Sequence, residues 1–271
     1  MKILDGRELA GFIEERQARQ VRALRQAWHI APKLAIVTTN DDPVTDVYMR
    51  LKKQYGEEIL IDVEVYRPND GELLKQIVQL NKDETVHGII IQLPLTDPSE
   101  TEAALDLVAP EKDVDGLGKN AVFTPATAMA IDWLVAGYNV ELRGKKIAVV
   151  GNGRLVGAPL AKLWLSAGLD VTVYDDTTVD LPAEIKKSEI IITATGVPGL
   201  IKSAMVQPGA VIVDAGTASE NGAIIGDVAA EVRERDDLIL TPIKGGVGPL
   251  TVTALFDNVI QAANATKPVE D

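Results

Sequence analysis

Apolar residues occur along the chain in two periodic patterns, which alternate in the order typical of an α/β protein. Short runs rich in β-branched residues predict strands buried on both faces of a parallel sheet, whereas apolar residues three or four apart predict amphipathic helices. In the first half the pattern predicts strands at 33–39, 58–66 and 86–92. Helices are predicted at about 5–28, 45–55, 71–81 and 98–108. Alternating strands and helices indicate a small α/β domain.

The second half repeats this alternation after a predicted linking helix at 124–136. Strands are predicted at 146–150, 171–174, 190–194, 210–214 and 238–241, and a last helix at about 251–264. A chain of 271 residues is long enough for two cores. We therefore expect two α/β domains, residues 1–120 joined by a C-terminal helix at 251–266, and residues 121–250.

Composition narrows the classes of function. The net charge of −13 argues against nucleic acid and anionic membranes as partners. The absence of cysteine excludes disulfides and thiolate nucleophiles, and two histidines, His29 and His87, leave little for a metal site, so no metal is expected. No apolar run reaches the ~18 residues of a membrane helix, and residues 1–5 lack the apolar core of a signal peptide. The expectation is a soluble, cytoplasmic protein.

A glycine-rich turn follows the predicted strand 146–150. Gly151, Gly153 and Gly157 separate this strand from an apolar-periodic segment. Strand, glycine turn and helix are the context of a dinucleotide-binding fingerprint, in which backbone N–H groups and a helix N-terminus receive a pyrophosphate. The spacing is G-x-G-x-x-x-G rather than G-x-G-x-x-G. On this motif alone, an ordinary strand-to-helix turn with glycines for close packing stays open.

Polar candidates for chemistry are concentrated in the first half. Tyr48 and Lys52 are four residues apart on a predicted helix and therefore share a face. Gln92 ends a predicted strand, where ligands bind in open α/β sheets. Residues 113–116 form an acidic Asp-Val-Asp-Gly turn. Each feature alone has an ordinary alternative: a surface pair, a loop-bonded amide and a plain turn.

In series, these stretches are far more specific. The chain contains Tyr-x-x-x-Lys, Gln-Leu-Pro-Leu, Lys-Asp-Val-Asp-Gly and Gly-Gly-Val-Gly-Pro motifs in that order. The matching segments are 42–52, 91–95, 112–116, 144–145, 156–159, 226–229 and 244–251. The chain therefore resembles the bifunctional methylenetetrahydrofolate dehydrogenase/methenyltetrahydrofolate cyclohydrolase family over nearly its whole length.

The resemblance implies a fold, two activities and a set of site residues. The fold would be a folate-binding catalytic domain and a Rossmann-type NAD(P)-binding domain with a cleft between them. The activities would be oxidation of 5,10-methylenetetrahydrofolate with NAD or NADP and hydrolysis of the methenyl product to 10-formyltetrahydrofolate, in one-carbon metabolism. Tetrahydrofolate derivatives would be the ligands, and the protein would be a homodimer through its nucleotide domain.

Roles follow residue by residue from the same resemblance. Lys52 would be the catalytic lysine, Gln92 its partner, Tyr48 the ring that stacks on the pterin, and Asp115 the carboxylate that binds the pterin's amino edge. The implied substrate-binding residues are Tyr48, Lys52, Gln92, Leu93, Asp115, Gly245, Gly246 and Pro249. The residues predicted to bind the cofactor, from the glycine turn and the segments around it, are Gly151, Asn152, Gly153, Arg154, Val156, Gly157, Asp175, Asp176 and Thr217.

The chain departs from the family pattern in four places. It is shorter between residues 116 and 124, and it has Lys244 where proline is usual. The family's Gly-Arg-Ser after the first nucleotide strand is Gly-Asn-Gly at 151–153, and its His-Ser-x-Thr after the second is Asp-Asp-Thr-Thr at 175–178. The folate half therefore matches well, while the cofactor half is altered.

The altered half bears on the choice of cofactor. Asp175 follows Gly151 by about 24 residues, close to the ~20-residue offset at which an acid binds the adenosine ribose hydroxyls of NAD. Asp176 adds a second negative charge, which would repel the 2′-phosphate of NADP, and Arg154 is the one nearby cation that opposes it. We therefore expect NAD rather than NADP.

Two other interpretations stay open from the sequence. One is an unrelated dehydrogenase of similar two-domain build, such as an enzyme of a shikimate-like acid. The other is a family member that has kept only the dehydrogenase activity, or only ligand binding.

Overall fold

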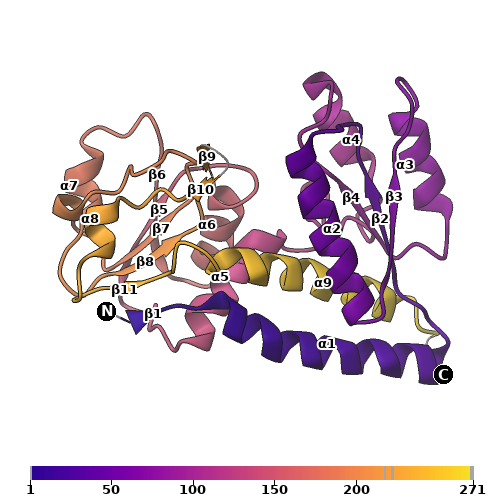
Figure 1. The fold of residues 1–271 in the computed structure, drawn as a ribbon, viewed down its shortest axis with the longest axis horizontal. Helices are drawn as coiled ribbons and strands as arrows, with labels where there is room; N and C mark the ends of the chain where they lie inside the picture. Colours follow the sequence, from indigo (N-terminus) through magenta and orange to yellow (C-terminus); the bar gives the residue numbers. More distant parts are fainter. Residues whose placement is uncertain (1, 217, 221–222, 269–271) are drawn as a thin grey trace. The chain divides into compact units, whose positions relative to one another are not determined.

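The computed structural model describes residues 2–216, 218–220 and 223–268 (Figure 1). The chain divides into two compact units, one within Met1–Ala10 and Thr127–Thr251 and the other within Gly11–Ala126 and Val252–Asp271. The boundaries between the units fall inside the two long helices α1 (Gly6–Trp28) and α9 (Val247–Ala265), and directly after the first residue of α5 (Ala126–Gly137). We call the units the six-stranded unit and the three-stranded unit after their sheets.

The three-stranded unit is built on a parallel sheet in the order β3-β2-β4. Its strands are β2 (Lys33–Val37), β3 (Asp62–Tyr66) and β4 (Gly88–Ile91). The helices α3 (Leu73–Lys82) and α4 (Thr101–Leu107), the latter preceded by a 3₁₀ turn η1 (Pro98–Glu100), share one apolar core with this sheet. That core includes Ala35, Val37, Leu73, Ile77, Leu80, Ile89, Ile91 and Leu105.

Helix α2 (Pro43–Glu58) precedes β3 and packs closely against it. A Cβ added at Gly56 would lie 2.5 Å from Val63 Cγ2, so only glycine permits this approach. The sequence predicted a strand from residue 58, but α2 runs on to Glu58 and β3 begins only at Asp62. The last turn of α2 packs against β3 at Gly56, a contact that the apolar periodicity does not reveal.

The six-stranded unit has a fully parallel sheet in the order β1-β11-β8-β7-β5-β6. The strands are β1 (Lys2–Ile3), β5 (Lys146–Val150), β6 (Asp170–Tyr174), β7 (Ile190–Thr193), β8 (Val211–Asp214) and β11 (Ile239–Leu240). From β5 the chain passes first to one side, at β6, and then back across to β7. Reversal of the strand order at β5 is the switch point at which Rossmann-type sheets bind ligands.

The other elements of this unit are short. They are α5 (Ala126–Gly137), α6 (Gly157–Ser166), α7 (Leu181–Ile185), η2 (Ser203–Met205), α8 (Ala230–Arg233) and an antiparallel pair, β9 (Ala218–Glu220) and β10 (Ala223–Ile225). The pair β9–β10 and strand β1 were not predicted from the sequence. Because β1 pairs with β11, the first residues belong to the six-stranded unit, whereas the sequence analysis placed them in the first domain.

The two-domain α/β architecture expected from the sequence is confirmed, with a parallel sheet in each unit. In the part of the chain that the structure describes, no helix combines the length and apolar character needed to cross a membrane.

Candidate functional site

Lys52 and Gln92 are joined directly in the three-stranded unit. Lys52 Nζ on α2 donates a hydrogen bond of 2.7 Å to Gln92 Oε1. Gln92 immediately follows β4, and its Nε2 donates to Leu93 O at 3.1 Å. Because the amide nitrogen is engaged by its own loop, its oxygen faces the lysine amine. Tyr48, one helical turn before Lys52, is 41% exposed.

The acidic turn expected at 113–116 contains two carboxylates with different surroundings. Asp113 is buried and accepts hydrogen bonds from Gly116 N (3.0 Å) and Gly118 N (2.7 Å), so it holds the turn together. Gly116 has φ +71°, and a Cβ there would lie 2.6 Å from Phe123 O. Asp115 is partly accessible and interacts electrostatically with Lys52. The second carboxylate is therefore the one available to a ligand.

Electrostatics tie Lys52 to this turn. Burial lowers the pKa of the Lys52 amine, and the negative charge of Asp115 partly opposes the shift. Burial raises the pKa of Asp115, with Lys52 opposing and Asp113 reinforcing that change. A lysine whose charged form is disfavoured exchanges protons more readily than an exposed lysine. Three of the four residues predicted to be catalytic thus lie together, and Tyr48 lies on the same helix.

Two supporting residues have no role that the sequence alone predicts. Lys112 Nζ donates to Leu80 O, Asn81 O and Asp83 O, at 3.2, 2.9 and 2.7 Å, at the C-terminus of α3. Asn258 Nδ2 on α9 donates to Val114 O at 2.8 Å and to Thr124 O at 3.0 Å. Asn258 thus fixes the backbone of the acidic turn, and Lys112 ties the residue before that turn to the end of α3. Only contacts between distant segments identify these two roles.

The glycine turn of the six-stranded unit has the shape that a dinucleotide fingerprint requires. Gly151 has φ +104°, and its N–H donates to Tyr174 O at 2.7 Å. A Cβ added at Gly157 would lie 1.7 Å from Gly151 O, whereas one at Gly153 would meet no atom of the described residues within 4 Å. The close approach of Gly151 and Gly157 leads directly into α6.

The other predicted cofactor residues lie around this turn. Asn152, Gly153 and Arg154 are exposed, and Val156 is the residue before α6. Thr217 lies outside the described residues.

Asp175 directly follows β6, whose last residue pairs with the last residue of β5, so it lies at the same carboxyl edge as Gly151. Its Oδ1 accepts hydrogen bonds from Thr177 N (3.0 Å) and Thr177 Oγ1 (2.6 Å), and these bonds lower the pKa of the carboxyl group. Asp176 is exposed. The turn after β6 thus presents two acidic side chains.

The Gly-Gly-Val-Gly-Pro segment differs from the predicted loop. Helix α9 begins at Val247, four residues earlier than expected, so Pro249 lies in its first turn. Gly245 has φ +90° and accepts a hydrogen bond from Gly6 N at 2.8 Å. A Cβ at Gly6 would lie 1.8 Å from Gly246 O. This segment therefore braces the start of α1 within the six-stranded unit.

Taken together, a parallel α/β unit with a half-buried lysine–glutamine pair and a Rossmann-type unit with a glycine turn define a two-domain nucleotide-dependent enzyme. Residues 4–115 match the model of the tetrahydrofolate dehydrogenase/cyclohydrolase catalytic domain, and residues 125–267 match that of the NAD(P)-binding domain. The chain belongs to the tetrahydrofolate dehydrogenase/cyclohydrolase family.

Individual relatives agree with this assignment. The chain is 36% identical to the bifunctional protein FolD of Exiguobacterium sibiricum, over 96% of this chain and 99% of that protein. A crystal structure of the FolD methylenetetrahydrofolate dehydrogenase/cyclohydrolase from Campylobacter jejuni is similar with a TM-score of 0.93 and 34% identity, covering 98% and 99% of the two chains. The structure of the Trypanosoma brucei enzyme, complexed with NADP and an inhibitor, is similar with a TM-score of 0.90 and 29% identity, and 97% of each chain is covered. The resemblance inferred from the motifs is confirmed, and the unrelated dehydrogenase is set aside.

Proposed function

We propose that the chain oxidises 5,10-methylenetetrahydrofolate to 5,10-methenyltetrahydrofolate with a nicotinamide dinucleotide, and hydrolyses the product to 10-formyltetrahydrofolate. The three-stranded unit would hold the folate and the six-stranded unit the dinucleotide. The observation that carries the proposal is the Lys52–Gln92 hydrogen bond beside Asp115, in a chain that matches the family in both domains. An absorbance assay for formation and decay of the methenyl compound tests it, and separates it from a member that only binds ligand or has lost hydrolysis.

The residues of the six-stranded unit fit a dinucleotide. The close Gly151–Gly157 approach leaves the exposed segment 152–155 in front of the N-terminus of α6, and space is open at Gly153. Backbone N–H groups at such a terminus favour phosphate. When bound, the nicotinamide accepts a hydride from the bridging carbon of the folate. Because this oxidation leaves a cation stabilised by two nitrogens and releases no proton, the chain's own residues have only to bind and orient the folate.

Hydrolysis makes a greater demand on the chain's residues. Water adds to the methenyl carbon and loses a proton, which gives a neutral carbinol; the bond from that carbon to N5 then breaks as N5 takes up a proton and the hydroxyl group loses its own, so that the formyl group stays on N10 and one proton is released overall. Lys52 is the group proposed to take and return the proton, since its lowered pKa makes the neutral amine accessible. Gln92 Oε1 accepts a hydrogen bond from the amine and so directs its lone pair.

Asp115→Ala is expected to weaken folate binding. A carboxylate that accepts N–H bonds from the pterin edge makes charge-assisted hydrogen bonds, whose loss costs about 1.5–3 kcal/mol each. Calorimetric titration with the folate measures the change. Glu111→Ala, an exposed acid in the same segment, is the matched control and should bind normally. Equal affinities for Asp115→Ala and the wild type would leave Asp115 as a turn residue only.

The proposed cofactor is NAD rather than NADP, and Asp175→Ser should move the preference toward NADP. Asp175 and Asp176 place two negative charges after β6, where a ribose 2′-phosphate would be repelled, and Arg154 offsets only part of that charge. Serine can still bond to Thr177, so the turn is kept. The measurement is kcat/KM with each nucleotide at equal folate. A wild-type preference for NADP, or a ratio unmoved by Asp175→Ser, would contradict the assignment.

The assembly and the location of the protein complete the proposal. A homodimer is proposed from the family resemblance, and light scattering after size-exclusion chromatography measures it. The cytoplasm is the proposed location, and fractionation of cells that express the full chain checks it.

A further inference from the structure

The start of α2, the helix that carries Tyr48 and Lys52, is held by residues outside the helix. Among the described residues, Asp42 at its N-cap makes no capping hydrogen bond through its side chain. Instead, the Asp42 N–H donates to Asn40 Oδ1 at 2.8 Å, so the preceding loop supplies the support. An N-terminus without its own cap depends for its direction on what holds that loop.

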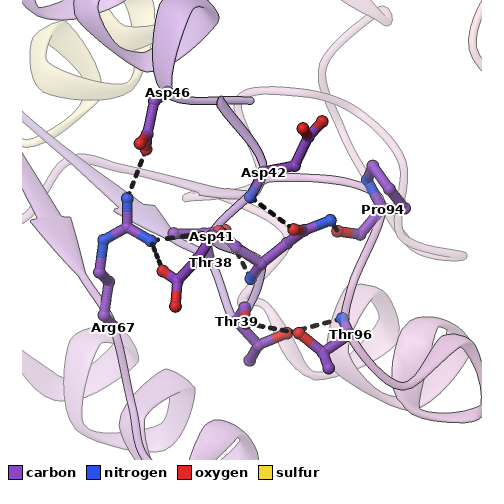
Figure 2. Close-up of polar contacts among 9 residues, drawn as sticks. Thr38, Thr39, Asp41, Asp42, Asp46, Arg67, Pro94 and Thr96 are labelled. Atoms are coloured by element: carbon purple, nitrogen blue, oxygen red, sulfur yellow. Dashed lines mark hydrogen bonds and ion pairs between the residues drawn. The ribbon is translucent and has the colours of Figure 1, made fainter. Parts of the chain in front are cut away.

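Arg67, immediately after β3, is the main support on one side (Figure 2). Its Nη1 donates to Asn40 O at 3.1 Å and to Asp41 Oδ1 at 2.5 Å, and its Nη2 donates to Asp46 Oδ1 at 2.6 Å. A single planar guanidinium thus joins the loop to the first turn of α2. Arginine suits this bridge because its donors form a rigid fork.

On the other side, the same loop is bonded to the segment that follows Gln92 (Figure 2). Thr96 N donates to Thr39 Oγ1 at 3.0 Å, and Thr96 Oγ1 donates to Thr39 O at 2.5 Å. Asn40 Nδ2 also donates to Pro94 O at 3.3 Å. The loop therefore connects the two segments that must place Lys52 and Gln92 within one hydrogen bond of each other.

We propose that Arg67 is a positioning residue for hydrolysis: by fixing the start of α2, it keeps the Lys52 amine at Gln92. Lys52 lies six residues after Asp46, roughly 9 Å along a helix that rises ~1.5 Å per residue, so a tilt at the first turn is transmitted to it. A displacement of about 1 Å at a reacting group can cost on the order of 10²-fold in rate. This inference rests on the proposed role of Lys52.

The test is the ratio of the two activities in Arg67→Met. Hydrolysis needs the Lys52 amine, whereas oxidation releases no proton. We expect kcat for hydrolysis to fall about tenfold and kcat for oxidation to fall less than about threefold. Loss of folded protein would lower both equally, so the ratio isolates positioning. Arg67→Lys, which keeps a cation but not the fork, should recover part of the loss.

Arg25→Met is the matched control. Arg25 is 37% exposed, compared with 40% for Arg67, and it pairs at 3.7 Å with Asp62 at the opposite end of β3. Its removal should leave the ratio of activities within about twofold of wild type. The positioning role is overturned if Arg67→Met keeps the wild-type ratio, or if Arg25→Met shifts it as much.

Lys52→Met, assayed in parallel, separates the role of Lys52 from the role of Arg67. If it retains hydrolysis, the role proposed for the lysine fails and the positioning role fails with it. If Lys52→Met does not hydrolyse the methenyl compound while Arg67→Met keeps the wild-type ratio of hydrolysis to oxidation, only the positioning role fails.

Discussion

Lys52→Met is expected to lose hydrolysis of the methenyl compound by about 10²- to 10⁴-fold, the usual contribution of a positioned acid–base group. The amine is hydrogen-bonded to Gln92, burial lowers its pKa, and Asp115 is its electrostatic partner. Methionine keeps a flexible chain of similar length in a half-buried site, so the fold should survive. The decay of methenyl absorbance, corrected for the uncatalysed rate, measures the loss.

Lys53→Met provides the control for that experiment. Lys53 is the next residue on α2, and it is exposed and belongs to a different face of the helix. Its replacement removes the same charge from the same helix but leaves the Lys52–Gln92 bond intact, so hydrolysis should continue at the wild-type rate. Retention of more than about a tenth of the activity in Lys52→Met would exclude the lysine as the proton carrier.

Gly157→Ala is expected to disable the dinucleotide site while leaving hydrolysis in place. The added Cβ would lie 1.7 Å from Gly151 O, and backbone cannot move aside as the end of a flexible side chain can. The turn must open, at a cost of about 1–3 kcal/mol or more, and α6 loses its position against the turn. Oxidation should fall at least a hundredfold, whereas Lys52, Gln92 and Asp115 all belong to the three-stranded unit and should still act.

Gly153→Ala is the control within the same turn. A Cβ there would meet no described atom within 4 Å, so its Tm should match that of wild type. Dinucleotide binding by calorimetry, Tm and both activities should be measured for the two variants. Normal dinucleotide affinity in Gly157→Ala would show that the turn adapts, and that its geometry does not define the site.

The sequence by itself determined the features that depend on short-range spacing. Runs of β-branched residues located the central strands, and the four-residue spacing of Tyr48 and Lys52 placed them on one helix face. Gly151 and Gly157 were identified as a turn because glycine alone tolerates both the positive φ and the close approach found there. The ordered motifs identified the family, because many short patterns in a fixed order rarely coincide.

Tertiary structure alone decided what depends on pairing between distant residues. Strand β1 is two residues long and has no periodicity, and it exists because it pairs with β11 more than 200 residues later. Helix α9 likewise begins at Val247, two residues after Gly245, whose carbonyl accepts a hydrogen bond from the N–H of Gly6 at the other end of the sequence. Local patterns carry no information about such contacts, since they are made by backbone N–H and C=O groups, which are the same in nearly every residue type.

The same reason separates the reacting groups from their supports. Lys52 and Gln92 could be selected by type and position, but the direction of the amide followed only from its bond to Leu93 O. Arg67 follows β3 and is not part of the helix that it holds, and nothing in its sequence neighbourhood indicates Asp46 as its partner. Residue types therefore specified the chemistry, while hydrogen bonds between distant segments specified the geometry in which that chemistry can occur.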